Sequence, residues 1–142
     1  MTPDGMALAA IVILLFPMGY FFLASPAFLL VKLDIPPVTQ LLGGMFSVHF
    51  LMLRIAAVIG MIAFAVAGRP AFVVGIALIA AIAIWGRGWF MQRWNAELSA
   101  RDAGNPDAVR QLRRLHWGGM LSNAVVLFAV VASIPYVSGA PG

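Results

Sequence analysis

The sequence contains no cysteine among its 142 residues, which excludes disulfides, thiolate metal sites and cysteine nucleophiles. Charged residues are also scarce, because they make up 10% of the chain, against about 25% in an average soluble domain. The sequence has no glycine-rich phosphate loop, no nucleophile beside a base and no pair of carboxylates within an apolar run. These are the groups on which most catalytic sites depend, so we do not expect an enzyme.

Apolar residues are abundant instead: 63% of the chain is hydrophobic and the mean hydropathy is +0.99. Apolar runs of about 18 residues or more indicate helices that cross a membrane. The sequence predicts such spans at about residues 6–31, 39–67, 71–94 and 115–135. We therefore predict an all-α fold, a polytopic membrane protein that forms a four-transmembrane-helix up-down bundle. Residues 1–142 would form a single membrane domain, with the lipid bilayer as its first partner.

Prolines and polar residues divide these spans. Pro17 and Pro26 lie inside the first span, where each removes a backbone donor and tends to kink a helix. Residues 95–114 are the only long polar stretch. Within that stretch the tripeptide at 105–107, Asn-Pro-Asp, is typical of a helix start, so the fourth helix should begin in water and enter the membrane near Leu115.

The cations are distributed unevenly between the two predicted membrane faces. The second connection contains only Arg69, whereas six cations flank the first and third connections, namely Lys32, Arg93, Arg101, Arg110, Arg113 and Arg114. Positive charge accumulates on the cytoplasmic side of membrane proteins. We therefore expect 95–114 in the cytoplasm and both termini outside, in a bacterial-type inner membrane. The net charge of +4 is then a topology signal, and we expect no nucleic acid partner.

Several polar residues fall at similar predicted depths in the cytoplasmic half of the membrane. At about 1.5 Å per residue, His49 and Asn123 lie about 12 Å from the cytoplasmic edge, Tyr20 about 16 Å and Arg54 about 20 Å. Because the second and fourth helices run parallel, His49 and Asn123 are expected to be partners. All four residues are candidate ligand-binding residues on the wall of one cavity.

Arg54 needs a counter-charge or a set of hydrogen-bond acceptors. A charged side chain at the centre of a transmembrane helix raises the free energy of membrane insertion by about 2.5–3.5 kcal/mol or more. All five acids lie outside the predicted spans, namely Asp4, Asp34, Glu97, Asp102 and Asp107. The open alternatives are backbone carbonyls and water, an anionic head group, or a contact with another subunit. Arg87 is shallower and is expected to reach the membrane surface by extending its side chain.

The two histidines allow a different hypothesis. A b-type haem could be held between His49 and His116 on the second and fourth helices. Their depths argue against it, because His116 is only a residue or two past the predicted membrane entry. At that level we expect His116 to be satisfied by head groups and water. Two histidines without nearby acids or thiols also make a poor metal site, so none is predicted.

The beginning of the fourth helix resembles a known group of proteins. It opens on Leu115-His116 and carries Asn123 two turns later, after a short basic segment. Over about residues 95–130 this is similar to bacterial four-helix integral membrane proteins of unknown function. The resemblance implies a four-span bundle and supplies no activity.

Three functions remain open. The leading hypothesis is a non-catalytic accessory or interaction subunit of a membrane assembly, with a membrane-protein partner or a homo-oligomer and no cofactor. It is motivated by the lack of catalytic groups, the many small residues, and an aromatic belt near the basic edge of the predicted spans, formed by Trp89, Trp94 and Trp117. The first alternative is a binding or transport protein with a cytoplasm-facing polar cavity for an anionic amphiphile. The second alternative is a bis-histidine haem b protein.

Overall fold

The computed structural model describes residues 2–137, and in that range the chain is all-α. The elements are α1 (Pro3–Ala24), the 3₁₀ helix η1 (Ser25–Leu30), α2 (Pro36–Val66), α3 (Pro70–Asp102) and α4 (Ala108–Val137). Each α-helix, with η1 continuing the first, is long and apolar enough to cross a membrane. The predicted four-helix membrane bundle is therefore confirmed, and the chain is a multi-pass membrane protein.

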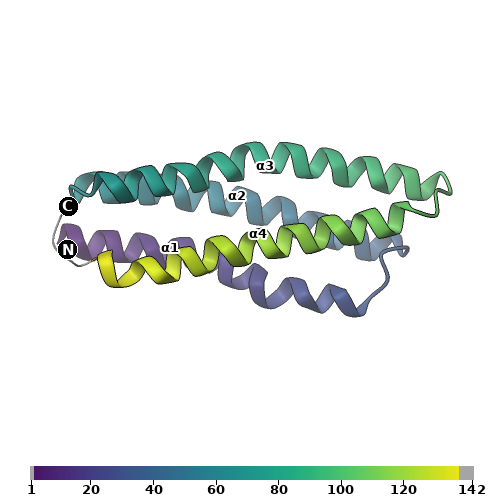
Figure 1. Cartoon of the computed structure of the whole chain (residues 1–142), viewed down its shortest axis with the longest axis horizontal. Helices are drawn as coiled ribbons and strands as arrows, with labels where there is room; N and C mark the ends of the chain where they lie inside the picture. Colours follow the sequence, from purple (N-terminus) through teal and green to yellow (C-terminus); the bar gives the residue numbers. More distant parts are fainter. Residues whose placement is uncertain (1, 138–142) are drawn as a thin grey trace.

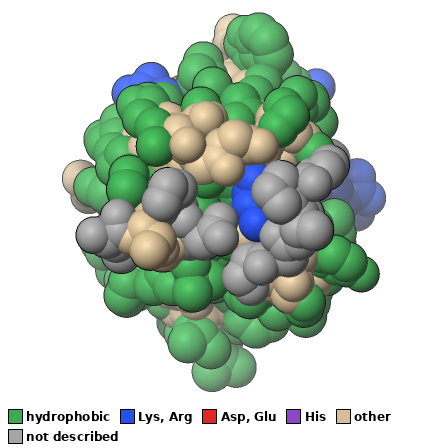
Figure 2. All heavy atoms as spheres, turned by 90° about the vertical axis from the view of Figure 1, so that its left-hand side faces the viewer, with side chains coloured by type: hydrophobic (Ala, Val, Ile, Leu, Met, Phe, Trp, Pro, Cys, Tyr) green, Lys and Arg blue, Asp and Glu red, His purple; other side chains and the backbone are tan. Residues whose placement is uncertain are grey.

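The helices lie side by side and alternate in direction along the long axis of the molecule (Figure 1). Each packs on the next in the chain, and α1 closes the bundle against α4, so α2 and α4 are diagonal. We call the end that carries the α1–α2 and α3–α4 connections the basic end, and the opposite end the terminal end. Figure 2 faces the terminal end and shows mainly hydrophobic side chains, with Lys or Arg visible at few places.

The first span is broken where the sequence predicts a kink. Pro17 is accommodated inside α1, but the α-helix ends at Ala24 and the chain continues as η1, with Pro26 in its first turn. Proline lacks the N–H that would continue the α-helical hydrogen bonds. Figure 1 shows the axis of the chain displaced at this point. The break exposes backbone groups at the basic end that other helices must satisfy.

The third helix is longer than the predicted span. α3 continues eight residues past Trp94, to Asp102, and the chain turns at Gly104, which has a φ of +91°. The side-chain oxygen of Asn105 accepts the N–H of Asp107 at 2.9 Å, directly before α4 begins at Ala108. Most of the polar segment 95–114 is thus helical, because its residues are compatible with a helix even though they are too polar for a lipid core.

Aromatic rings fill the core near the basic end, where Phe21, Phe46, Phe90 and Trp94 are almost fully buried. Toward the terminal end the core consists mainly of Ala, Leu and Ile side chains. The aromatic layer joins three helices, since the ring of Phe46 on α2 lies 4.9 Å from that of Phe21 on α1 and 4.3 Å from that of Phe90 on α3.

Candidate functional site

Two arginines within the spans open on one cavity between α2 and α3. It has a volume of about 340 Å³ and is lined by Ser47, Arg54, Ile84, Arg87, Gly88 and Met91. We call it the arginine notch. Ile84 is 48% exposed, so the notch opens on the outer surface of the helix pair rather than into the centre of the bundle. In a membrane-spanning chain that surface faces lipid.

Arg87 is held across the notch rather than extended to the surface. Its Nη2 donates to the hydroxyl of Ser47 at 3.0 Å, and its Nε is buried without an acceptor. The expectation that Arg87 reaches the membrane surface is therefore wrong, because a hydroxyl on the neighbouring helix lies at the same level. Ser47 keeps its own proton available to donate.

Arg54 lies two turns along α2 from Ser47, about 10 Å toward the terminal end. No hydrogen bond or ion pair of Arg54 occurs within the described residues, where the ion pairs join Arg101 to Asp102 and Arg110 to Asp107 at the basic end. The notch thus combines two guanidinium groups and one hydroxyl, with no carboxylate on its wall.

The structure does not bring the four predicted ligand-binding residues into one cavity. Arg54 lines the arginine notch, whereas Tyr20 and His49 line a separate groove of about 430 Å³ between α1 and α2. The prediction that Arg54 shares the wall of one cavity with Tyr20, His49 and Asn123 is therefore wrong. Similar depth along the helices was not enough, because these side chains leave their helices in different directions.

The predicted pairing of His49 with Asn123 is also wrong. The amide nitrogen of Asn123 donates to the backbone oxygen of Met18 on α1 at 3.0 Å. The ring of His49 stacks on Phe21 of α1, with ring centroids 4.4 Å apart. Since α2 and α4 are diagonal, α1 provides the contacts for both residues. Tyr20 is 67% exposed, so its side chain points out of the bundle.

His116 is fully buried, which contradicts its predicted place at the interface with head groups and water. Its Nε2 lies 2.9 Å from the hydroxyl and 3.1 Å from the backbone oxygen of Ser25, and its Nδ1 lies 3.1 Å from Nη1 of Arg113. The misplacement has a physical reason. Helix packing continues beyond the apolar run, since Ala108 and Leu112 at the start of α4 are also fully buried.

These contacts define the tautomer of His116. A guanidinium can only donate, so Nδ1 of His116 must accept from Arg113 and the proton must sit on Nε2, which donates to Ser25. Both ring nitrogens are therefore engaged. The rings of Phe21 and Phe46 also lie against the two histidines, with Phe46 edge-on to His116 at 6.0 Å. The residues present do not fit a haem held between His49 and His116.

Three further arginines donate hydrogen bonds to backbone oxygens at the ends of helices. Arg113 donates to the oxygens of Phe28 at 2.8 Å and Val31 at 2.5 Å, at the end of η1. Arg101 donates to the oxygen of Leu33 at 3.1 Å. At the terminal end Arg69 is 4% exposed and donates to the oxygen of Tyr136 at 3.1 Å. These three arginines hold the ends of helices together.

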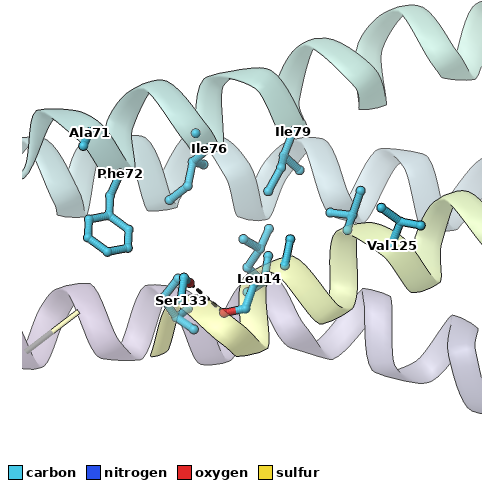
Figure 3. Close-up of a pocket in the computed structure, with 12 residues that line it drawn as sticks. Leu14, Ala71, Phe72, Ile76, Ile79, Val125 and Ser133 are labelled. Atoms are coloured by element: carbon cyan, nitrogen blue, oxygen red, sulfur yellow. Dashed lines mark hydrogen bonds between the residues drawn. The ribbon is translucent and has the colours of Figure 1, made fainter. Parts of the chain in front are cut away.

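A cavity at the terminal half of the bundle differs in character from the notch. It measures about 360 Å³ and lies between α1, α3 and α4. Figure 3 shows Phe72, Ile76 and Ile79 of α3 above Leu14 of α1 and the residues of α4. The only hydroxyl on its wall, that of Ser133, donates to the oxygen of Val130 at 2.6 Å. Among the described residues that line it, this cavity has no charged side chain with which to select an ionic ligand.

The sequence pointed to Arg54 as a candidate site residue but did not point to the other two polar residues of the notch, Arg87 and Ser47. The signal was available in the spacing of α2, because Ser47 and Arg54 are seven residues apart and share a face. No family model, curated protein or solved structure matches this chain. The resemblance to bacterial four-helix membrane proteins therefore stays a prediction.

Proposed function

We propose that this protein is a non-catalytic membrane protein that binds an anionic amphiphile at the arginine notch. The observation that carries the proposal is that Arg54 and Arg87 line one lipid-facing cavity with no carboxylate on its wall. Each charge placed within the membrane costs about 2.5–3.5 kcal/mol or more. An anion supplied from outside the chain would offset that cost and would accept hydrogen bonds from both guanidinium groups.

The opening of the notch supports an amphiphile rather than a water-soluble anion. Ile84, Gly88 and Met91 form the apolar part of the wall, next to which a hydrocarbon tail can lie. A lipid can enter such a site sideways from its own leaflet, with its head group drawn toward Arg54. The cation asymmetry supports an orientation with the basic end in the cytoplasm, in a bacterial-type inner membrane.

The leading sequence hypothesis, an accessory subunit with a protein partner or homo-oligomer, makes a competing use of the same charges. An acidic side chain on a neighbouring transmembrane helix would also neutralise Arg54 and Arg87. The size of the notch favours a lipid. The cavity of about 340 Å³ is formed by this chain alone and does not need a neighbouring helix to complete it. The experiment below separates the two.

The test is native mass spectrometry of protein purified in mild detergent. We expect the wild type to retain anionic lipid, and the double variant Arg54→Leu, Arg87→Leu to lose it while it still folds. Arg93→Leu is the matched control, because it removes an exposed cation of α3 that lies over Trp89, outside the notch. The same lipid complement in wild type and double variant would overturn the proposal.

A second variant blocks the notch without changing its charge. Gly88 lines the notch, and a Cβ added there would meet no atom within 4 Å, so Gly88→Leu should fill the cavity and displace the lipid. Gly19→Leu on α1 is the control, because a Cβ there also meets nothing and Gly19 lines none of the cavities described above. A protein that co-purifies with the wild type in place of lipid, and is lost from the double variant, would support the accessory role instead.

A further inference from the structure

We infer that the notch selects a head group with two negative charges, such as a phosphomonoester, over one with a single charge. This inference rests on the proposed function and names the class of its ligand. A guanidinium group carries a positive charge in proteins. The notch therefore carries two permanent positive charges within one cavity of about 340 Å³.

Nothing on the wall of the notch neutralises these charges. Of its six lining residues, Ser47 is the only polar one besides the arginines. The described acids that form ion pairs, Asp102 and Asp107, do so with Arg101 and Arg110 at the basic end. Unpaired charge in a medium of low dielectric constant is costly. A monoanion would leave one of the two positive charges without a counter-charge.

The donors of the notch also match the acceptors of a phosphomonoester. Arg87 uses Nη2 for its bond to Ser47 and has further N–H groups on its guanidinium, and Ser47 still has its own proton to donate. Arg54 contributes a whole guanidinium that is not hydrogen-bonded within the described residues. A phosphomonoester carries about two negative charges at neutral pH and three oxygens that accept hydrogen bonds. A phosphodiester has one charge and two such oxygens.

The experiment compares phosphatidic acid with phosphatidylglycerol, using the full-length protein in mixed micelles at about pH 7.5. We expect the wild type to bind phosphatidic acid about tenfold more tightly, because one more charge-assisted contact is made. Inorganic phosphate should not compete with phosphatidic acid, since the notch opens on the lipid-facing surface. Competition by inorganic phosphate would overturn the assignment to a lipid head group.

Single variants test whether the preferred charge of the head group follows the number of arginines in the notch. In Arg54→Leu or Arg87→Leu one positive charge remains, so phosphatidylglycerol should still bind and the preference for phosphatidic acid should fall to within about twofold. Arg93→Leu should keep the full preference. Equal affinity of the wild type for both lipids would overturn this inference and leave the proposed function standing. No loss of either lipid in the double variant would overturn both.

The pH dependence gives an independent readout. The second pKa of a phosphomonoester is about 6, so lowering the pH from about 7.5 to about 5 converts free phosphatidic acid from a dianion to a monoanion. We expect its affinity to fall toward that of phosphatidylglycerol, whose affinity should not change. A preference that does not vary with pH, or two bound phosphatidylglycerol molecules per chain in place of one phosphatidic acid, would contradict the selection of a dianion.

Discussion

At the scale of single residues, the structure separates side chains that look alike in the sequence. Gly118 and Gly119 are neighbours on α4, yet only Gly119 lies against the ring of Phe46. Gly43 and Gly44 form a similar pair on α2. A Cβ on Gly43 would lie 2.6 Å from Nε1 of Trp94, whereas one on Gly44 meets nothing within 4 Å. One glycine of each pair is therefore required for helix packing.

This difference predicts opposite effects of the same substitution. Gly119→Ala should lower the free energy of unfolding by about 1–3 kcal/mol, because the added Cβ would overlap the fully buried ring of Phe46. Gly118→Ala should be neutral or raise it by up to about 1 kcal/mol, because alanine favours a helix. Thermal unfolding of both variants in the same detergent measures the difference. Equal stability of the two variants would show that Phe46 moves aside.

At the scale of elements, η1 depends on contacts from other helices. It is six residues long, and 3₁₀ helices of more than three or four residues are uncommon because their hydrogen bonds have poor geometry. Arg113 of α4 holds the oxygens of Phe28 and Val31, and His116 holds Ser25. The histidine that the resemblance singles out thus holds Ser25 at the break in the first span.

Removal of Arg113 should loosen this element alone. In Arg113→Leu we expect the amide hydrogens of residues 27–34 to exchange about tenfold faster or more, because two charge-assisted hydrogen bonds are lost. Protection in the middle of α2 and α3 should not change. Arg110→Leu is the control, since Arg110 pairs with exposed Asp107 one turn away. Unchanged exchange in Arg113→Leu would mean that η1 is stable without this contact.

At the scale of the whole molecule, the two ends of the bundle differ in their cations. Arg101 and Arg113 at the basic end are bonded to the backbone of the η1–α2 region, and Arg69 is buried at the terminal end. Several of the cations that motivated the predicted orientation are therefore also structural. The asymmetry between the two ends remains, because exposed Arg93, Arg110 and Arg114 all lie toward the basic end.

The orientation is tested by labelling introduced cysteines, which is clean because the chain has none of its own. A cysteine at exposed position Ser99 of α3 should react with a membrane-impermeant reagent only after the cells are opened. A cysteine at Gly139, which lies outside the described residues, should react in intact cells. The proposed orientation is wrong if Ser99→Cys is labelled from outside.

The amino-acid sequence alone determined the class of the protein, since apolar runs set the number of spans and prolines marked the break near Pro26. These are local properties, because the free energy of transfer into a membrane adds up along a segment and does not depend on its neighbours. Tertiary structure decided which polar residues meet. His49 and Asn123 have the same predicted depth, but whether they meet depends on the rotation of each helix about its axis. That rotation is set by how all four helices pack together, so Arg54 lines the same cavity as Arg87 while His49 and Asn123 contact α1.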